Sequence, residues 1–318
     1  MPKKCSTTPR CAPRTWASKQ RESCGRASRP QGYPVNIYVL VLLFVTLVWG
    51  ATFPVLKFAT AQLSGLEVSA LRFFVAAALM LPFAVRAPKQ AWKDGGVLGV
   101  IVLVSYVAQA YGLEHISSNR SAFLTSLNVL MVPLLGFALG ARPGWLVWVA
   151  AALACAGIGL MSWEGGSHWW ADAATILGAL AYAVDVIVLS KWAVRHNPKH
   201  LAATQVVWMA SLGGVWMLFA SIGTDRLATL PDRMDWPVFA SLVYLGVIAT
   251  AGMLFLQAIA QRHVSADKAA LVYAMEPVFA AVFAWFWLNE MMSVQASIGA
   301  ALVVAAVVMS EYPQRRAA

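Results

Sequence analysis

Charged residues are scarce in this chain of 318 residues. They make up 12% of the sequence, whereas a soluble globular domain carries about 25%. Hydrophobic residues make up 60%, and the mean hydropathy is +0.66. Too little polar side-chain surface remains to cover a water-soluble particle of this length. The composition therefore predicts an integral membrane protein with the lipid bilayer around it.

Sequence motifs for metal binding and catalysis are also missing. The four cysteines, Cys5, Cys11, Cys24 and Cys155, show no CxxC or Cys/His ligand spacing, so neither a metal site nor a disulfide framework is indicated. No HExxH, GxSxG or P-loop motif occurs. We therefore expect neither an enzyme nor a cofactor. A membrane-embedded hydrolase or lipid-modifying transferase stays an alternative, which chemical conversion of a lipid by the purified protein would support.

Basic residues exceed acidic ones, with a net charge of +10. Eight of the 24 basic residues lie in the first 34 positions, and most others lie in short turns between apolar segments. This placement is typical of cytoplasmic loops, so we expect no nucleic-acid partner. Residues 1–34 lack apolar periodicity and are predicted to form a disordered basic cytoplasmic tail. A transit peptide or a start codon assigned too early are alternatives for this segment.

Ten apolar segments follow the tail. Each can supply the roughly 20 residues that cross a ~30 Å hydrocarbon core. The predicted spans are 35–58, 66–86, 95–113, 118–140, 144–163, 172–192, 201–222, 237–260, 266–288 and 292–311. The connections between them are short, which leaves no room for a separate soluble domain.

The basic residues also predict the orientation of these spans. With the N-terminus inside, 19 of the 24 fall on the cytoplasmic side, as the positive-inside rule requires. The outer five are Lys57, Arg72, Arg120, Arg226 and Arg233. Both termini are therefore predicted to be cytoplasmic. Lys57 and Arg72 are expected to anchor the outer ends of their helices by reaching the lipid headgroups.

One stretch of the chain occurs twice, 148 residues apart. Residues 109–129 read QAYGLEHISSNRSAFLTSLNV, and residues 257–277 read QAIAQRHVSADKAALVYAMEP. Each copy crosses a polar turn from one apolar segment into the next, which indicates an internal duplication. The ten predicted spans divide into two repeats of five. Because five is an odd number, the second repeat must enter the membrane from the opposite side. We predict two inverted five-helix repeats, 35–163 and 172–311, whose rocking gives alternating access.

Several motifs within these repeats resemble the EamA repeat of the drug/metabolite transporter superfamily. They are WGATF at 49–53, ALRF at 70–73, AFLTSLNVLMVPLL at 122–135, AYAVDVIVLSK at 181–191 and ALVYAMEPVFAAVFAWFWLNE at 270–290. The first repeat departs from the pattern, because Asn128-Val129 stands where the second repeat has Glu276-Pro277. The resemblance implies a ten-helix carrier of the bacterial inner membrane with a central cavity. Such carriers move small metabolites such as amino acids, usually outward.

Two carboxyl groups are predicted to lie at membrane depth, where ionisable side chains are costly and functional by default. Asp185 lies deep in the segment 172–192, one turn after Tyr182. Glu276 lies near the middle of the segment 266–288, three residues after Tyr273. Each carboxyl can bind a substrate ammonium or exchange a proton. The alternative is a hydrogen-bonded neutral group that fixes helix packing.

Polar and aromatic residues on the helices that the resemblance places around the cavity complete the predicted substrate site. Gln109 and Gln257 are repeat-equivalent amides that line the pathway or hydrogen-bond across the pseudo-two-fold axis. The predicted site as a whole comprises Trp49, Thr52, Tyr106, Gln109, Asn128, Tyr182, Asp185, Gln257, Tyr273 and Glu276.

A secondary transporter that exports a small amphipathic metabolite accounts for these features. A passive channel or uniporter with structural carboxyls is the alternative. Pro54, Pro133 and Pro277 each remove a helical hydrogen bond and predict helices that bend. Gly136 and Gly140 allow close helix approach, either within the chain or in a homodimer.

Overall fold

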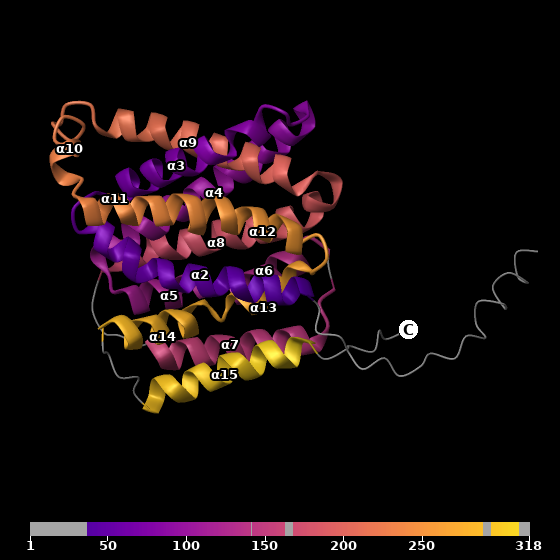
Figure 1. Ribbon diagram of the computed structural model, residues 1–318. Coiled ribbons are helices and arrows are strands. Elements are labelled where there is room, and N and C mark those ends of the chain that lie inside the picture. The colour runs from indigo at the N-terminus through magenta and orange to yellow at the C-terminus, as the bar shows by residue number, and fades with distance from the viewer. Residues whose placement is uncertain (1–36, 141, 163–167, 289–293, 312–318) are drawn as a thin grey trace, which may run out of the picture. The chain divides into compact units, whose positions relative to one another are not determined.

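The chain is helical throughout the parts that the structure, a computed structural model, describes. These are residues 37–140, 142–162, 168–288 and 294–311 (Figure 1). No strand occurs within these ranges, which confirms the predicted all-helical class for them. The predicted tail at 1–34 lies outside the described residues.

We call residues 37–162 the first half of the bundle and residues 168–311 the second half. The first half contains α2 (Ile37–Thr60), α3 (Gly65–Ala84), α4 (Lys89–His115), α5 (Ser118–Ser126), α6 (Asn128–Ala138) and α7 (Trp145–Ser162). The second half contains α8 (Trp169–Trp192), η1 (Ala193–Arg195), α9 (Pro198–Ala220), α10 (Leu230–Arg233), α11 (Trp236–Val243), η2 (Tyr244–Gly252), α12 (Met253–Ala260), α13 (Ala266–Tyr273), α14 (Glu276–Leu288) and α15 (Val294–Glu311).

Seven helices among the described residues are long and apolar enough to cross a membrane. They are Ile37–Thr60, Gly65–Ala84, Lys89–His115, Arg120–Ala138, Trp169–Arg195, Pro198–Ala220 and Trp236–Ala260. Two further helices, Trp145–Leu160 and Ser297–Met309, are apolar but shorter than these seven. The predicted span 266–288 is divided between α13 and α14.

Helices from the two halves pack against each other throughout the bundle. The most extensive contacts join α7 to α15, α3 to α9 and α4 to α8. In the middle, α2 packs on α14 and α6 packs on α8. In Figure 1, α2, α6 and α8 run between the α3–α9 pair on one side and the α7–α15 pair on the other. The central helices are therefore enclosed by both halves.

Several helices begin with a capping residue, whose side chain accepts a hydrogen bond from a backbone N–H group of the first turn. Ser64 and Glu67 form a capping box at the start of α3, with the Ser64 N–H donating to Glu67 Oε2 at 2.6 Å. Asp235 caps α11 by accepting from the Val238 N–H at 2.9 Å. Gly140 follows the end of α6 with φ +87°, a left-handed conformation that favours glycine. No atom of the described residues lies within 4 Å of a Cβ built at Gly140, so this residue makes no close helix contact with any of them.

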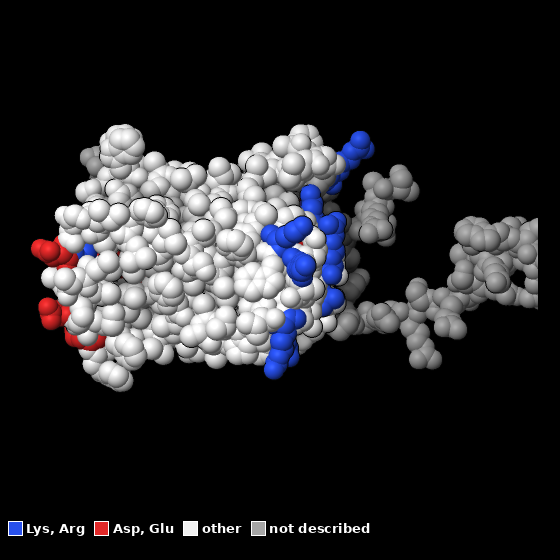
Figure 2. Space-filling view, turned by 90° about the horizontal axis from the view of Figure 1, so that it is seen from above, with Lys and Arg blue, Asp and Glu red and all other residues white. Residues whose placement is uncertain are grey.

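The charged side chains divide between the two ends of the bundle. Figure 2 shows Lys and Arg gathered at one end and Asp and Glu at the other, with an uncharged band between them. The exposed basic residues include Arg86, Lys89, Lys93, Lys191, Arg195, Lys199 and Arg262. Exposed apolar side chains such as Phe44, Leu134 and Phe219 face outward between the ends. An apolar outer band of this kind is the surface that a bilayer covers.

Candidate functional site

Two helices break at equivalent positions of the duplicated stretch. Within the span Arg120–Ala138, α5 ends at Ser126 and α6 starts at Asn128, so that only Leu127 separates them. In the second half, α13 ends at Tyr273 and α14 starts at Glu276. Asn128 and Glu276 are 148 residues apart, so each opens the second segment of its broken helix. Pro54 and Pro133 lie inside continuous helices, whereas Pro277 follows a break directly.

A small cavity lies beside these breaks, among helices of both halves. Its volume is about 30 Å³, which leaves room for roughly one or two water molecules. The residues that line it are Trp49, Thr52, Ser105, Tyr106, Gln109, Thr125, Tyr182 and Glu276. Pockets that enclose small organic ligands measure about 300–1,000 Å³. The helices around this cavity must therefore separate before it can hold a metabolite.

Three aromatic rings pack together on one wall of the cavity. The ring centroid of Trp49 lies 5.8 Å from that of Tyr182 and 5.6 Å from that of Tyr273. The two tyrosine rings lie 5.7 Å apart. Trp49 Nε1 donates to the Ala249 carbonyl at 2.9 Å, which fixes the indole. Close approach of α2 to α14 permits this packing, because a Cβ at Gly50 would lie 2.7 Å from the Cβ of Phe279.

Both predicted carboxyl groups belong to this region. Glu276 lines the cavity and is 5% exposed, and Asp185 is fully buried behind it. Neither forms an ion pair with another described residue. Gln257 lies close enough to Asp185 to interact with its carboxyl. Yet among the residues that the structure describes, neither Asp185 oxygen and neither polar atom of Gln257 has a hydrogen-bond partner of good geometry. Polar groups left in this state at membrane depth are expected at a site that accepts a ligand or a proton.

The expected anchoring role of Arg72 is wrong. Its side chain is 2% exposed because it projects from the packed face of α3 rather than from the face that reaches the headgroups. Arg72 Nε donates to Thr250 Oγ1 at 2.9 Å, and the guanidinium carbon lies 4.7 Å from the centroid of the Tyr106 ring. Its Nη2 atom has no partner, and it forms no ion pair with any residue the structure describes. Arg72 is thus a buried cation directly behind one wall of the cavity.

Thr250 belongs to a π-helical stretch, Tyr244–Gly252, between α11 and α12. The Thr250 hydroxyl also donates to the Leu245 carbonyl at 2.7 Å. The same stretch supplies the Ala249 carbonyl that holds Trp49. π-Helical turns are frequent at functional sites because they widen the helix and leave carbonyls free for other donors. Here one such stretch holds both Trp49, which lines the cavity, and Arg72, which lies behind Tyr106.

The predicted site residues fall into three groups in the structure. Trp49, Thr52, Tyr106, Gln109, Tyr182 and Glu276 line the cavity. Tyr273, Asp185 and Gln257 lie next to it, through the aromatic cluster and through interactions with each other. Asn128 is 1% exposed and is not among the lining residues. The predicted site did not include Ser105, which lines the cavity, or Arg72, which lies behind it. Thr125, a further polar group on a helix expected around the cavity, lines it too. Arg72 belongs to the motif ALRF at 70–73, within the predicted span 66–86. A basic residue inside an apolar span was the feature from which its burial could have been predicted.

Comparison with known proteins identifies the family. The profile of the EamA-like transporter family matches residues 36–163 and again residues 169–312. The chain belongs to the EamA-like transporter family. The two matches place one family repeat in each half. Asn128 lies in the first matched range and Glu276 in the second, at equivalent positions of the duplicated stretch.

Relatives within the EamA-like family carry transporter names. An uncharacterized transporter of Archaeoglobus fulgidus is 27% identical over 281 residues, which cover 85% of this chain and 84% of the relative. A probable terminal-alkyne amino-acid exporter of Streptantibioticus cattleyicolor is 27% identical over 289 residues, covering 86% and 92%. An S-adenosylmethionine uptake transporter of Rickettsia prowazekii is 24% identical over 273 residues, covering 82% and 87%.

A solved crystal structure shares this fold. Its TM-score is 0.68 at 16% identity, and the alignment covers 89% of this chain and 98% of that one. With the family match and the apolar helices, these findings establish a multi-pass membrane protein of a transporter family. The names of the family and of the relatives are those of transporters rather than enzymes.

Proposed function

We propose that this protein is a secondary carrier that exports small amphipathic metabolites, amino-acid-like compounds among them, across the bacterial inner membrane. It works by alternating access between two inverted five-helix repeats that together supply ten spans. The observation that carries the proposal is the central cavity, which both halves enclose. It is lined by the Glu276 carboxyl, which is buried and forms no ion pair with any described residue.

The pattern of helix contacts supports the inverted arrangement. A two-fold axis between the halves would exchange α2 with α8, α3 with α9 and the broken helix α5–α6 with α13–α14. The observed contact of α2 with α14 then corresponds to that of α8 with α6. The contact of α3 with η2 corresponds likewise to that of α9 with α4. Two packings of similar energy follow from such symmetry, as alternating access requires.

The chemistry of the cycle is assigned to Glu276, with Asp185 behind it. In the state open to the cytoplasm, a cationic group of the substrate neutralises the Glu276 carboxylate. In the state open to the outside, a proton takes the place of the substrate cation. Each state then carries a neutral site across the membrane, which avoids the cost of moving an uncompensated charge through hydrocarbon. The three aromatic rings supply contact for an apolar part of the same substrate.

Orientation and direction are part of the proposal. The basic end of the bundle in Figure 2 is assigned to the cytoplasm by the positive-inside rule. Both termini are proposed to lie in the cytoplasm, as the distribution of basic residues in the sequence predicts. Export is favoured by the resemblance and by the name of the Streptantibioticus relative. The Rickettsia relative is named for uptake, so a transport assay that follows both directions tests this part of the proposal.

The first experiment compares culture media from cells that produce the wild type, Glu276→Gln or Asp232→Asn at equal membrane abundance. Asp232 is exposed outside the bundle core, so Asp232→Asn controls for loss of a carboxylate as such. We expect a set of metabolites to be enriched for the wild type and for Asp232→Asn, and to be absent for Glu276→Gln. Equal enrichment for Glu276→Gln would remove that residue from the mechanism.

A second experiment separates a coupled carrier from a passive channel. The enriched metabolite is loaded at equal concentration on both sides of proteoliposomes, and a pH gradient is imposed. A coupled carrier accumulates the metabolite against its own gradient, and Glu276→Gln abolishes that accumulation. Flux that only equalises concentrations would instead support the uniporter.

A further inference from the structure

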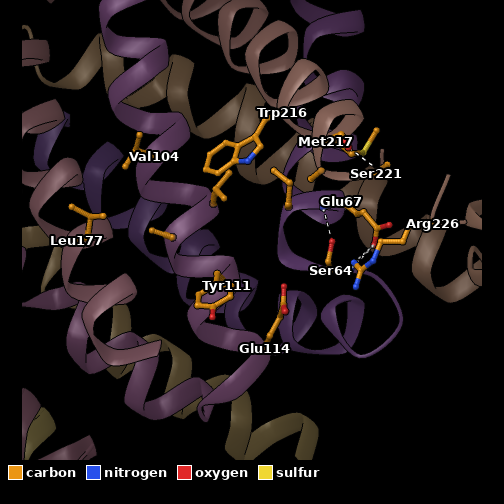
Figure 3. Close-up of a pocket in the computed structure, with 14 residues that line it drawn as sticks. Ser64, Glu67, Val104, Tyr111, Glu114, Leu177, Trp216, Met217, Ser221 and Arg226 are labelled. Atoms are coloured by element: carbon orange, nitrogen blue, oxygen red, sulfur yellow. Dashed lines mark hydrogen bonds and ion pairs between the residues drawn. The ribbon is translucent and has the colours of Figure 1, made fainter. Parts of the chain in front are cut away.

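A second and larger hollow lies on the side of the bundle, away from the central cavity. Its volume is about 570 Å³, and it shares no lining residue with the central cavity. It lies between the start of α3, the second part of α4 and the end of α9 (Figure 3). Helix α4 separates the two spaces, because Tyr106 and Gln109 face the central cavity while Val107 and Tyr111 face the hollow.

The wall of this lateral hollow is mainly apolar. Its apolar lining residues are Leu66, Val104, Val107, Ala108, Leu177, Trp216, Met217 and Ala220. Leu177 is 53% exposed and Trp216 is 46% exposed, so the hollow opens on the outward face that the bilayer covers. Trp216 and Tyr111 both point into it (Figure 3). A space bounded by apolar side chains and open to lipid is filled by hydrocarbon rather than by water.

The mouth of the lateral hollow carries opposite charges. Glu67 is already satisfied, because Arg233 binds both of its oxygens, at 2.8 and 3.0 Å. Arg226 is 3.9 Å from Glu67 and 54% exposed, so most of its guanidinium is free. Across the mouth, Glu114 accepts a hydrogen bond from the Gly65 N–H and forms no ion pair within the described chain. Lys57 is the nearest cation to Glu114, but its amine donates to the Leu113 and Ile116 carbonyls.

A polar space adjoins this mouth. A further hollow of about 430 Å³ shares Ser64, Glu114 and Arg226 with the lateral one. It is lined by polar groups that include Thr60, Gln62 and Thr229. An apolar space at membrane depth therefore continues into a polar space that has a carboxylate on one side and a guanidinium on the other. An amphipathic molecule with a zwitterionic head and a hydrocarbon tail matches this order.

We infer that the lateral hollow binds a phospholipid whose headgroup carries a primary ammonium, such as phosphatidylethanolamine. The lipid phosphate pairs with Arg226, and the ammonium donates hydrogen bonds to Glu114. One acyl chain packs along Val107, Leu177 and Trp216. A quaternary ammonium has no N–H to donate to Glu114, and a glycerol headgroup has no cation. The site is therefore expected to discriminate between headgroups.

Native mass spectrometry of the delipidated full-length protein tests this inference. The protein is titrated with equal amounts of phosphatidylethanolamine, phosphatidylcholine and phosphatidylglycerol, all with the same acyl chains. We expect the wild type to retain phosphatidylethanolamine about tenfold over phosphatidylcholine, as for one hydrogen-bonded charge pair. Glu114→Gln keeps the acceptor for the Gly65 N–H and should reduce this ratio to about one. Asp232→Asn should leave the ratio as it is in the wild type.

A blocking variant tests the acyl-chain part of the site. Ala220 lines the hollow and is exposed, so Ala220→Phe fills the space without entering the bundle core. We expect it to lower the number of retained lipids by about one per protein. Leu218→Phe is the matched control, because Leu218 is 55% exposed and does not line the hollow. Ala220→Leu replaces the larger variant if the melting temperature shows that Ala220→Phe is unfolded.

The inference is overturned by any of three results. They are equal retention of the three lipids by the wild type, a preference for phosphatidylglycerol, and unchanged retention in the Ala220 variants. None of these results bears on the proposed export, because the assay contains no transported metabolite and no variant alters the central cavity.

Discussion

The two copies of the duplicated stretch have the same backbone plan but different chemistry. In each, a glutamine near the end of one helix faces the last turn before the break in the next. Gln109 donates to Thr125 at 3.3 Å, and Gln257 lies beside Tyr273. The residue that opens the next segment is Asn128 in the first copy and Glu276 in the second. Both carboxyls at the central cavity, Glu276 and Asp185, therefore belong to the second half.

The difference extends to the helix before each turn. In the first half, α4 is a regular α-helix from Lys89 to His115. In the second half, the corresponding helix contains the π-helical stretch η2 before α12. Arg72 from the first half reaches across to Thr250 in that stretch. One half thus supplies carboxyls and irregular backbone, and the other supplies a buried cation. Duplication provides the scaffold, and divergence within it provides the site.

The largest effect is expected when the two break positions are exchanged. Glu276→Gln should reduce transport to background, because no other carboxyl lines the cavity among the described residues. The double variant Asn128→Glu/Glu276→Asn moves the carboxyl to the equivalent position of the first half. Because Asn128 does not line the cavity, we expect the double variant to be inactive too. Transport is measured in proteoliposomes at equal protein content.

Recovery of transport in the exchanged protein would mean that the halves are interchangeable at this position. That result would contradict the asymmetry described above. A melting curve in detergent serves as the control for folding of both variants.

The next largest effect concerns the cation from the first half. Arg72→Lys keeps the charge but loses the planar contact with Tyr106 and the hydrogen bond to Thr250. We expect a loss of about 2 kcal/mol in the free energy of unfolding, the scale of a desolvated cation–π contact, together with slower transport. Thr250→Val removes the Arg72 hydrogen bond and should cost about 1 kcal/mol. Chemical denaturation in detergent gives both values, and an Arg72→Lys protein as stable as the wild type would argue against this contact.

A smaller effect is expected from the two repeat-equivalent amides. Gln257→Leu removes two unpaired buried polar atoms next to Asp185, so the melting temperature should stay the same or rise. Transport should nevertheless fall several-fold, because the amide is the polar neighbour of that carboxyl. Gln109→Leu breaks a hydrogen bond to Thr125 and should cost about 1 kcal/mol of stability. The decisive measurement is the change in melting temperature of each variant. It should be zero or positive for Gln257→Leu and negative for Gln109→Leu, and equal changes would contradict the difference between the two amides.

The smallest effect concerns an ion pair that links the halves away from the central cavity. Glu67 on α3 binds Arg233 on α10 through two hydrogen bonds, which raise the pKa of Arg233 above its ordinary value. Glu67→Gln should lower the free energy of unfolding by about 1–2 kcal/mol. Transport at saturating substrate should change less than twofold. A loss of transport as complete as that of Glu276→Gln would show that this pair gates the pathway instead.

The sequence by itself determined the helical membrane class, the duplication and the pairing of Asn128 with Glu276. These features depend on hydropathy and on residues that recur along the chain, and neither requires knowledge of which residues are in contact. Glu276 and Tyr182 were also predictable as cavity residues, because a polar group in an apolar span needs a polar environment.

The tertiary structure alone decided which side of each helix faces the cavity. Arg72 turned inward, Asn128 stayed out of the lining, and Ser105 and Thr125 entered it. An apolar span in a membrane has no polar face to mark its orientation, because lipid and protein interior are equally apolar. Rotation of such a helix is set by packing against its neighbours, as at Gly50 and Phe279. The π-helical stretch around Thr250 was likewise found only in the structure, where Arg72 and Trp49 form hydrogen bonds to it.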